Sequence, residues 1–334
     1  MARGKGPTYS ELSNMTGISV ATISRVMNRS SLVTDKTREK VLSALKSSGV
    51  DTSEYEMRDT FSNLIVFNVP SLRNIFYSPV ISSARIRIEE KGYTLFINED
   101  TVNDDNIDSF IARMKRVGAK GLVLANPLSV DALERLSHEF HIVTCCETVP
   151  SSEFPFVNID DRGGAYKAVR HLLSIGRRRI AMINGPEEFK YARERRAGYE
   201  EALWEYGIDV DESYVACVGE DMDYDTAKRH AERLLNLADP PDAFFCISDI
   251  LASAAENAAV KKKLDVPSDV AIVGFDDTMV SHIANPAIST IRQPVERIGS
   301  SVADLIIGLI EGKEGINRSV LLDTELVIRE SSAV

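Results

Sequence analysis

Short apolar segments alternate regularly with amphipathic helical segments from residue 63 to the C-terminus, and this alternation most constrains the fold. A short apolar run bounded by turn residues is typical of a strand buried on both faces. Such strands, each followed by a helix, form parallel sheets with right-handed crossovers. The sequence therefore predicts a doubly wound α/β fold, with strands at Leu64–Val69, Thr94–Asn98, Gly121–Leu124, Ile142–Thr144, Ile180–Ile183, Ala243–Ile247 and Val270–Gly274.

The segment from residue 63 onward is too long for one sheet of this kind. Hydrophobic cores stop growing at ~250 residues, and longer segments divide into smaller compact parts. A new series of strand and helix begins at Asp160-Asp161-Arg162-Gly163-Gly164. We therefore expect two lobes, with the boundary near residue 160.

Charge is divided unevenly along the chain. The total of −11 argues against DNA binding, but residues 1–50 carry eight basic and only three acidic side chains. That segment has a net charge of +5, so the remainder has −16. A basic segment on an acidic body is typical of a phosphate-binding module joined to a separate sensor, although an unstructured basic tail would have the same charge.

The basic segment also has the pattern of three short helices. Thr8 and Ser19 are suited to cap the first two helices, and Gly17 permits a sharp turn between them. A third helix is expected to begin at Thr34 and to end near Gly49. The apolar side chains of the three helices would form one small core: Leu12, Met15, Ile23, Val26, Met27, Val41, Leu42 and Leu45. We interpret residues 1–49 as a helix-turn-helix domain, with an ordinary three-helix bundle as the alternative.

The second helix of a helix-turn-helix enters the major groove of DNA. Arg25 is the strongest candidate for reading a base, because its guanidinium group can donate two hydrogen bonds to guanine, worth ~1–3 kcal/mol against a wrong base. The candidate reading face consists of Ser19, Val20, Ala21, Thr22, Ser24 and Arg25.

These residues resemble the lactose-repressor-like (LacI) family of transcription regulators. The similarity is carried by Thr8-Tyr9-Ser10-Glu11-Leu12, by Gly17-Ile18-Ser19-Val20-Ala21-Thr22-Ile23-Ser24-Arg25-Val26-Met27-Asn28 and by Val33-Thr34-Asp35-Lys36-Thr37-Arg38-Glu39-Lys40-Val41. It extends over nearly the whole chain, although Ser13 and Thr16 replace the usual alanines. The resemblance implies that Val20, Ala21 and Arg25 contact bases, and that Thr8, Ser19, Ser24 and Asn28 hold the DNA backbone.

The resemblance also implies a body of periplasmic-binding-protein type, with further crossings between the lobes near residues 290 and 320. Residues 63–334 would bind an effector, most simply a sugar or sugar derivative, and form a homodimer. Two heads would then meet a pseudo-palindromic operator in double-stranded DNA, and the effector would change their spacing. Induction and corepression both remain open.

Effectors of doubly wound folds bind beyond the carboxyl ends of the strands. Asp276 ends a buried strand, where a carboxylate can accept two hydrogen bonds from sugar hydroxyls. Asn74, Phe76 and Tyr77 follow the first strand, and the resemblance places the two aromatic rings against the effector. Packing between the lobes is the alternative role for these rings.

The resemblance assigns further residues to the effector site. Arg195 would point into the cleft, unless it forms a surface ion pair, and Gln293 and Asp160 would lie at the cleft or its rim. Two positions depart from the family pattern, which leaves the identity of the effector open. Ser248-Asp249 stands where many relatives have Asn-Asp, and Cys146-Glu147 stands where sugar-binding members often have Asp-Arg.

Other functions find little support in the sequence. It lacks the GxxxxGK[ST] loop, a GxGxxG after a strand, the GxSxG elbow and the i, i+4 histidine pair of zinc enzymes, so we expect no enzyme activity, cofactor or metal. No apolar run is long enough to span a membrane and the N-terminus has no export signal, so a cytoplasmic location is expected. The four cysteines are expected to be buried thiols. A solute-binding sensor without DNA output and a nucleoside- or purine-responsive regulator are the alternative functions.

Residues 50–62 form the expected hinge between head and body, and here the chain departs furthest from the family. Relatives use a leucine in this segment to wedge open the minor groove, and the matching position is Asp59. Acidic side chains at Asp51, Glu54 and Glu56 would also repel phosphates. We expect an unfolded linker that bends the operator weakly, with Met57 as a displaced wedge in the alternative view.

Overall fold

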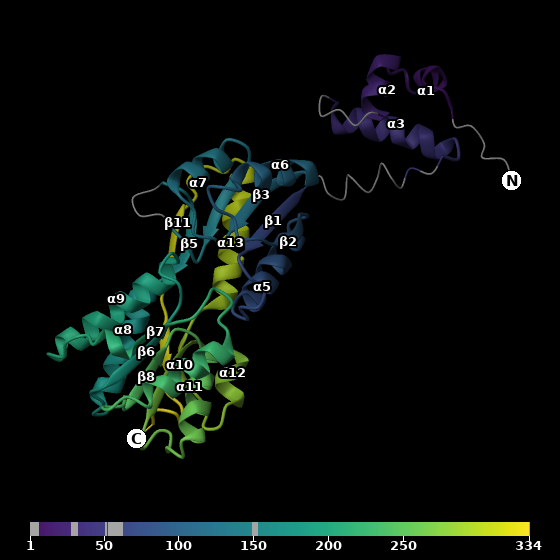
Figure 1. Cartoon of the computed structure of the whole chain (residues 1–334). Coiled ribbons are helices and arrows are strands. Elements are labelled where there is room, and N and C mark those ends of the chain that lie inside the picture. Colours follow the sequence, from purple (N-terminus) through teal and green to yellow (C-terminus); the bar gives the residue numbers. More distant parts are fainter. Residues whose placement is uncertain (1–6, 28–32, 51, 53–62, 149–152, 334) are drawn as a thin grey trace. The chain divides into compact units, whose positions relative to one another are not determined.

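The computed structural model describes residues 7–27, 33–50, 52, 63–148 and 153–333. The chain divides into two compact units, Met1–Asn63 and Leu64–Val334, each of which is described by itself (Figure 1). Most of the expected hinge, including Met57 and Asp59, lies outside the described residues.

The first two helices of the first unit begin where the sequence predicts, and the first also ends at the predicted glycine. Helix α1 (Tyr9–Thr16) has a capping box at Thr8, and its C-cap Gly17 has a left-handed φ of 68°. Helix α2 (Val20–Met27) follows, and the backbone N–H of its third residue donates to Ser19 Oγ over 3.2 Å. The side chains therefore satisfy part of the unpaired backbone at each helix start.

Helix α3 (Asp35–Ser47) completes the small core of the first unit. Met15, which we expected in this core, is 55% exposed. Thr16 is buried instead, and its hydroxyl donates to the carbonyl oxygen of Leu12 over 2.6 Å, which satisfies the polar group that replaces the family's alanine. The buried apolar residues are Leu12, Ile23, Val26, Val41, Leu42 and Leu45.

The second unit contains two six-stranded sheets, one in each lobe (Figure 1). In the first sheet the strand order is β11-β5-β4-β3-β1-β2, and all neighbours are parallel. Its strands are β1 (Leu64–Val69), β2 (Thr94–Glu99), β3 (Ala119–Leu124), β4 (His141–Cys145), β5 (Phe156–Ile159) and β11 (Ser319–Leu322).

The second sheet has the order β12-β10-β9-β8-β6-β7, and only its β10–β12 pair is antiparallel among the pairs described. Its strands are β6 (Ile180–Asn184), β7 (Val215–Cys217), β8 (Ala243–Cys246), β9 (Ala271–Asp276), β10 (Ser289–Arg292) and β12 (Glu325–Val327). The chain enters this lobe after β5, leaves it after β10, and enters it again between β11 and β12.

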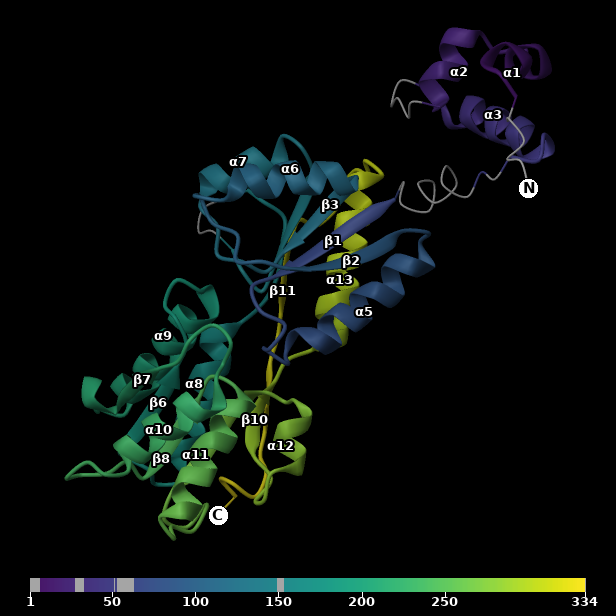
Figure 2. The same cartoon turned by 45° about the vertical axis from the view of Figure 1, so that its right-hand side comes forward.

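Helices cover both faces of each sheet. In the first lobe, Ile65 and Phe67 point to the face that packs on α5 (Tyr77–Glu90) and α13 (Val295–Ile310). These two helices lie side by side in Figure 2. The alternate residues Leu64 and Val66 pack on α6 (Ile107–Val117) and α7 (Val130–Ser137). Alternation along the strand therefore supplies apolar side chains to both faces.

The second lobe has the same layered arrangement, with α8 (Asp161–Ser174), α9 (Lys190–Glu205), α10 (Tyr224–Leu234), α11 (Asp249–Lys261), α12 (Met279–Ile283) and a short 3₁₀ turn, η1 (Glu212–Tyr214). Helices α8 and α9 pack closely, because Gly198 has no side chain: a Cβ atom there would lie 2.2 Å from the carbonyl oxygen of Arg162. This close approach holds α9 at the edge of the cavity between the lobes described below.

No helix in the described ranges is both long and apolar enough to cross a membrane. The expectation for the cysteines is partly wrong. Cys145 and Cys246 are buried, Cys146 is partly buried, and Cys217 is exposed, because it lies on β7 at an edge of the second sheet.

Candidate functional site

A narrow cavity lies between the two lobes, beyond the carboxyl ends of strands from both sheets. Eight of the predicted effector residues line it: Asn74, Phe76, Tyr77, Cys146, Arg195, Ser248, Asp276 and Gln293. Parallel strands present their carboxyl ends at one edge of a sheet, which is why side chains distant in sequence meet there. Five further residues complete the lining: Ile159, Asp161, Tyr191, Met222 and Ile247.

Arg195 is the buried cation of this cavity. Its Nε donates to Asp161 Oδ1 over 2.9 Å, and Nη1 donates to the carbonyl oxygen of Ile247. The guanidinium carbon also lies 3.5 Å from the ring centroid of Phe275. With 6% of its surface exposed, Arg195 is a buried charge with several partners and not a surface ion pair.

Asp161 balances two cations at the cavity wall. Lys190 Nζ donates to Asp161 Oδ2 over 2.7 Å, and Arg195 occupies the other oxygen. Burial by itself would raise the pKa of Asp161, but the neighbouring Arg195 and Lys190 outweigh burial and hold the pKa below its usual value. Asp161 is therefore ionised and paired.

Asp276 is the second carboxylate, at the end of β9. Gln293 Nε2 donates to Asp276 Oδ1 over 2.7 Å, and Arg195 Nη1 lies 3.6 Å from the same oxygen. Burial raises the pKa of Asp276, while Arg195 and Gln293 oppose the rise. Its φ of 105° is left-handed, a costly conformation for a residue with a side chain and one that is found where surrounding bonds enforce it.

Ser248 provides the clearest sign of a ligand. Its Oγ is buried and has no hydrogen-bond partner among the described residues, although the residue is only 4% exposed and lines the cavity. A buried polar group without a partner costs ~1–3 kcal/mol, and of the six such side-chain atoms among the described residues only Ser248 Oγ lines this cavity. A hydroxyl-bearing effector in the cavity would supply the missing partner.

Aromatic rings form the apolar side of the cavity. Phe76 and Tyr77 pack edge to face, with ring centroids 5.6 Å apart. Tyr191 lies one helical turn before Arg195 on α9, and the arginine guanidinium carbon lies 5.5 Å from its ring centroid. The cavity therefore combines apolar surface with a few oriented polar groups, as small-molecule sites do.

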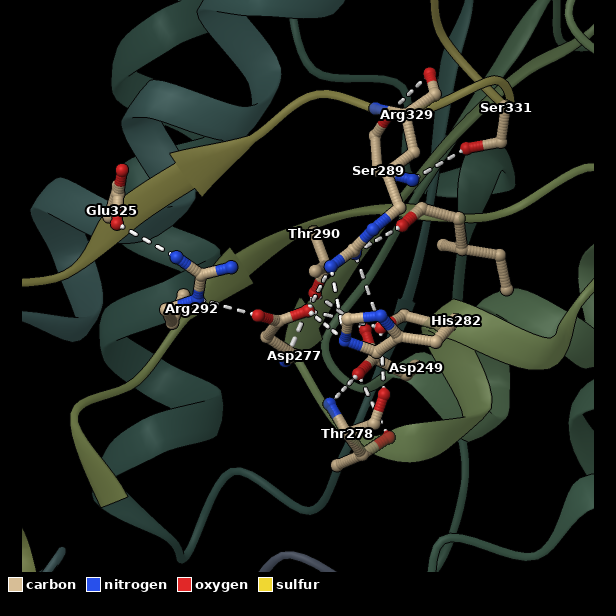
Figure 3. A network of polar contacts seen from close by, with 12 residues as sticks. Asp249, Asp277, Thr278, His282, Ser289, Thr290, Arg292, Glu325, Arg329 and Ser331 are labelled. Carbon is tan, nitrogen blue, oxygen red and sulfur yellow. Dashed lines mark hydrogen bonds and ion pairs between the residues drawn. The ribbon is translucent and has the colours of Figure 1, made fainter. Parts of the chain in front are cut away.

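Asp249 does not line the cavity, and Figure 3 shows it within a neighbouring network of polar contacts. Its carboxylate accepts bonds from Thr278 N and Oγ1 and from Thr290 Oγ1. Burial, together with the nearby Asp276 charge, raises its pKa. The side chain thus joins the start of α12 to β10.

The residue after Asp276 belongs to the same polar network (Figure 3). Asp277 Oδ1 accepts a bond from Arg329 over 2.6 Å, and Oδ2 accepts one from Arg292 over 2.6 Å. Because Asp277 is anchored in this way, the backbone that places Asp276 in the cavity is held from both sides.

Two other predicted residues also lie outside the cavity lining. Asp160 is the N-cap of α8, and its Oδ1 accepts from the Gly163 N–H over 2.8 Å, so its neighbour Asp161 lines the cavity instead. Glu147 lines an adjacent cavity of about 280 Å³ between the lobes, which also includes Glu188 and Arg193.

Sequence reasoning missed Asp161, Tyr191 and Met222. The i, i+4 spacing of Tyr191 and Arg195 on one helix was an available signal. Asp161 differs from the predicted Asp160 by one position at a helix start, which composition does not resolve. Met222 lies in a loop and itself has a left-handed φ of 53°, for which the sequence has no visible signal.

The free space inside the cavity is about 20 Å³, roughly the room that one water molecule needs. A sugar or nucleoside is far larger. Such a ligand therefore enters only if the two lobes or their side chains separate, which makes binding and lobe geometry interdependent.

The predicted DNA-reading face is exposed on the first unit. Ser19, Val20, Ala21 and Arg25 are exposed, while Thr22 and Ser24 are partly exposed; Thr8, at the start of α1, is also exposed. The opposite side of α2 is buried through Ile23 and Val26. Asn28 lies outside the described residues.

Comparison with known proteins identifies the class. Residues 11–50 match the family model of bacterial regulatory proteins of the lacI family, and residues 169–332 match the periplasmic binding protein-like domain. The HTH-type transcriptional repressor CytR of Escherichia coli (strain K12) is 31% identical, over 94% of this chain and 93% of that protein. The chain therefore belongs to the lacI family.

Other relatives support the same assignment. The HTH-type transcriptional regulator DegA of Bacillus subtilis (strain 168) is 29% identical over 98% of both chains. A solved structure of the transcriptional regulator CelR in complex with cellobiose is 28% identical, covers 97% of this chain and 99% of that chain, and has a TM-score of 0.74. The protein is a DNA-binding transcription regulator, and its relatives are regulators and not enzymes.

Proposed function

We propose that this regulator is a cytoplasmic repressor that binds a pseudo-palindromic operator as a homodimer, and that a small neutral polyhydroxy compound, a sugar or sugar derivative, controls its operator affinity. The observation that carries the effector assignment is the buried hydroxyl of Ser248, which has no partner in the described chain and lines the cavity that contains Asp276.

The polar groups of the cavity match the hydroxyls of a sugar. A hydroxyl both donates and accepts, so it can donate to Asp276 and accept from Gln293 or Ser248. Phe76 and Tyr191 offer apolar surface to the C–H face of a ring. The cellobiose bound by the relative CelR is a ligand of this class.

The charges of the cavity favour a neutral effector. Arg195 and Lys190 are already paired with Asp161, and Arg195 also lies beside Asp276. An anionic ligand would have to displace these carboxylates from a buried cation, which is costly. Phosphorylated or acidic sugars should therefore bind more weakly than their neutral counterparts.

The first unit supplies the DNA-reading surface. Val20, Ala21 and Arg25 are exposed on one side of α2, whose other side is fixed in the core, so the three side chains are free to enter a major groove. This surface also argues against a solute-binding sensor without DNA output.

Exposed apolar residues on the second unit support a homodimer. They lie on α5, on the edge strand β2 and on α12, which lie along one side of this unit in both overall views (Figures 1 and 2). An apolar edge strand is prone to pair with other chains unless it is covered. A second copy would cover Ile86, Phe96, Ile97, Met279 and Ile283, which are 55%, 41%, 48%, 76% and 72% exposed.

A nucleoside is the second candidate effector. Phe76, Tyr77 and Tyr191 gather three aromatic rings at the cavity, and rings of this kind stack on bases. The same polar groups would then bind the ribose hydroxyls.

A thermal-shift screen of the full chain tests the effector class. The compounds are neutral mono- and disaccharides including cellobiose, their phosphates, and nucleosides, because a ligand that binds only the folded state raises its stability by mass action. We expect neutral sugars to raise Tm and Ser248→Ala to reduce the shift. A response confined to nucleosides would favour the second candidate, and a response confined to phosphates would contradict the neutral assignment.

Operator titration with the compound found then measures the control of transcription. A fall in operator affinity identifies induction, and a rise identifies corepression. An effector that binds without changing operator affinity would contradict the proposed regulation.

A further inference from the structure

Glu147 joins the two lobes outside the effector cavity. It follows β4 of the first lobe, and its two carboxylate oxygens each lie 3.1 Å from the backbone nitrogen of Lys190, the first residue of α9 in the second lobe. Glu147 is 4% exposed. The carboxylate is thus buried, and its bond spans the lobe boundary.

The first lobe holds Glu147 rigidly. Cys146 N–H donates to the carbonyl oxygen of Val157 over 3.0 Å, and Asn158 Nδ2 donates to the carbonyl oxygen of Glu147 over 3.3 Å. Cys146 has a left-handed φ of 61°, a conformation that costs free energy and that the bonds to β5 maintain. This backbone turn directs the next side chain toward the second lobe.

Helix α9 has no side-chain cap from its own chain segment. Its N-cap residue is Phe189, which offers no hydrogen-bond acceptor from its side chain. The first backbone N–H groups of a helix lack partners within the helix and need an acceptor oxygen from elsewhere. Glu147 therefore caps α9 from the other lobe.

We propose that the Glu147 to Lys190 N–H bond is a latch that sets the separation of the lobes and positions α9 over the effector cavity. Tyr191 and Arg195, both on the first turns of α9, line that cavity. A change in the latch therefore moves the two residues that face the effector. Glu147 acts as a positioning residue and does not itself line the cavity.

Two exposed polar contacts between the lobes are weaker. Arg73 Nη1 lies 3.5 Å from Asp221, with 80% of the arginine side chain exposed, and Thr101 donates to Glu220 over 3.3 Å at the surface. Exposed pairs of this kind contribute ~0–1 kcal/mol. The buried latch should dominate them.

Proline at position 190 provides a specific test of the latch. Lys190→Pro removes the donating N–H, while proline is well tolerated at the first position of a helix. Phe189 already has the extended φ of −83° and ψ of 137° that a residue before proline prefers. Lys190→Ala is the matched control, because it also removes the ammonium group that pairs with Asp161 but retains the N–H.

Pulsed electron paramagnetic resonance on the full chain measures the distance between the lobes. Spin-labelled non-canonical residues replace the exposed Asp131 on α7 and the exposed Val260 on α11, and labelled chain is diluted with excess unlabelled chain. No effector is added. Only the effect of the latch on effector binding rests on the proposed function. Because the measurement contains no effector, a failed latch is distinguishable from a failed effector assignment.

We expect Lys190→Pro to lower the ratio of closed to open molecules about fivefold relative to Lys190→Ala, the effect of a hydrogen bond of ~1 kcal/mol. Glu147→Leu should open the lobes similarly, whereas Glu147→Gln, which retains an acceptor oxygen, and Glu188→Gln in the same cavity should not. In a Glu147→Leu background, Lys190→Pro and Lys190→Ala should have the same ratio of closed to open molecules.

Equal distance distributions for Lys190→Pro and Lys190→Ala would overturn the proposal. So would a difference between them that persists in the Glu147→Leu background. If Glu147→Leu does not fold, the comparison of Lys190→Pro with Lys190→Ala in the otherwise native chain decides the question by itself.

Discussion

Gln293 donates its side-chain amide to Asp276 over 2.7 Å, so the end of β9 is joined to the segment that returns the chain to the first lobe. Both residues are buried and line the candidate effector cavity. This bond therefore links the ionisation of Asp276 to the geometry of a lobe crossing.

Removal of the amide should raise the pKa of Asp276 further. In Gln293→Leu the carboxylate loses a donor that favours its charged form, while its burial remains. Carboxyl-detected nuclear magnetic resonance titration of aspartate-labelled protein, assigned with Asp276→Asn, measures the change. The exposed Glu296→Gln is the control, and an unchanged or lower pKa in Gln293→Leu would contradict the prediction.

Arg195→Ala should destabilise the second unit by ~3–5 kcal/mol, because it leaves Asp161 and Asp276 buried with less compensating charge. Urea unfolding measures the loss. Arg162→Ala, which removes an exposed pair with Glu201, should cost no more than ~1 kcal/mol. Similar losses in the two variants would show that the buried network is not the source of stability.

The raised pKa of Glu147 predicts a specific pH dependence of the free energy of unfolding. Burial raises this pKa from its ordinary value of 4.5 to about 8, with Asp161 adding to the rise and Lys190 and Arg193 opposing it. The folded state then holds a proton that the unfolded state releases. The protonated Glu147 therefore contributes stability to the folded state. This contribution is fully present below pH 4.5, declines as the pH rises, and is lost above pH 8.

Glu147→Gln should therefore flatten the fall in unfolding free energy across that pH range, since glutamine does not titrate. Denaturant unfolding at a series of pH values measures the slope. The exposed Glu188→Gln is the control and should leave the slope as in the native chain. Parallel slopes for the native chain and Glu147→Gln would show that Glu147 ionises normally.

Arg25→Ala should reduce the discrimination between operator and random DNA by ~1–3 kcal/mol, because the guanidinium group would read a base. Lys36→Ala should weaken binding to operator and to random DNA alike, and it should reduce the slope of log affinity against log salt concentration by ~1. Fluorescence titration at several salt concentrations, with an operator recovered by in vitro selection, separates the two effects. Equal loss on both DNAs for Arg25→Ala would exclude base reading.

The apolar face on α12 should be needed for dimerisation. Ile283→Glu places a charge where 72% of an apolar side chain is exposed, so we expect a monomer in sedimentation equilibrium and weaker operator binding. Trp204→Glu, on α9, changes a residue that is 81% exposed on a different helix and should remain dimeric. A dimeric Ile283→Glu would place the interface elsewhere.

Much of the fold followed from local patterns. Thr8 and Gly17 determine the ends of α1 through bonds that reach only a few residues, so their roles are visible in sequence. The seven predicted strands are present because each is apolar enough to be recognised by itself. Strands β5, β7, β10, β11 and β12 have three or four residues each and were not predicted, since their pairing depends on partners distant in the chain.

The candidate effector site likewise contains residues that local sequence predicts and residues that only the tertiary structure places. The place of Asp276 in the cavity was predictable because Asp276 ends a buried strand, and the carboxyl ends of the strands border the cleft. The choice of Asp161 over Asp160 depended on Arg195, 34 residues away, because only the tertiary structure brings that cation to one carboxylate and leaves the other to cap a helix. Local bonds act between neighbours in sequence and can be read there, whereas a buried charge is placed by whichever distant partner compensates it.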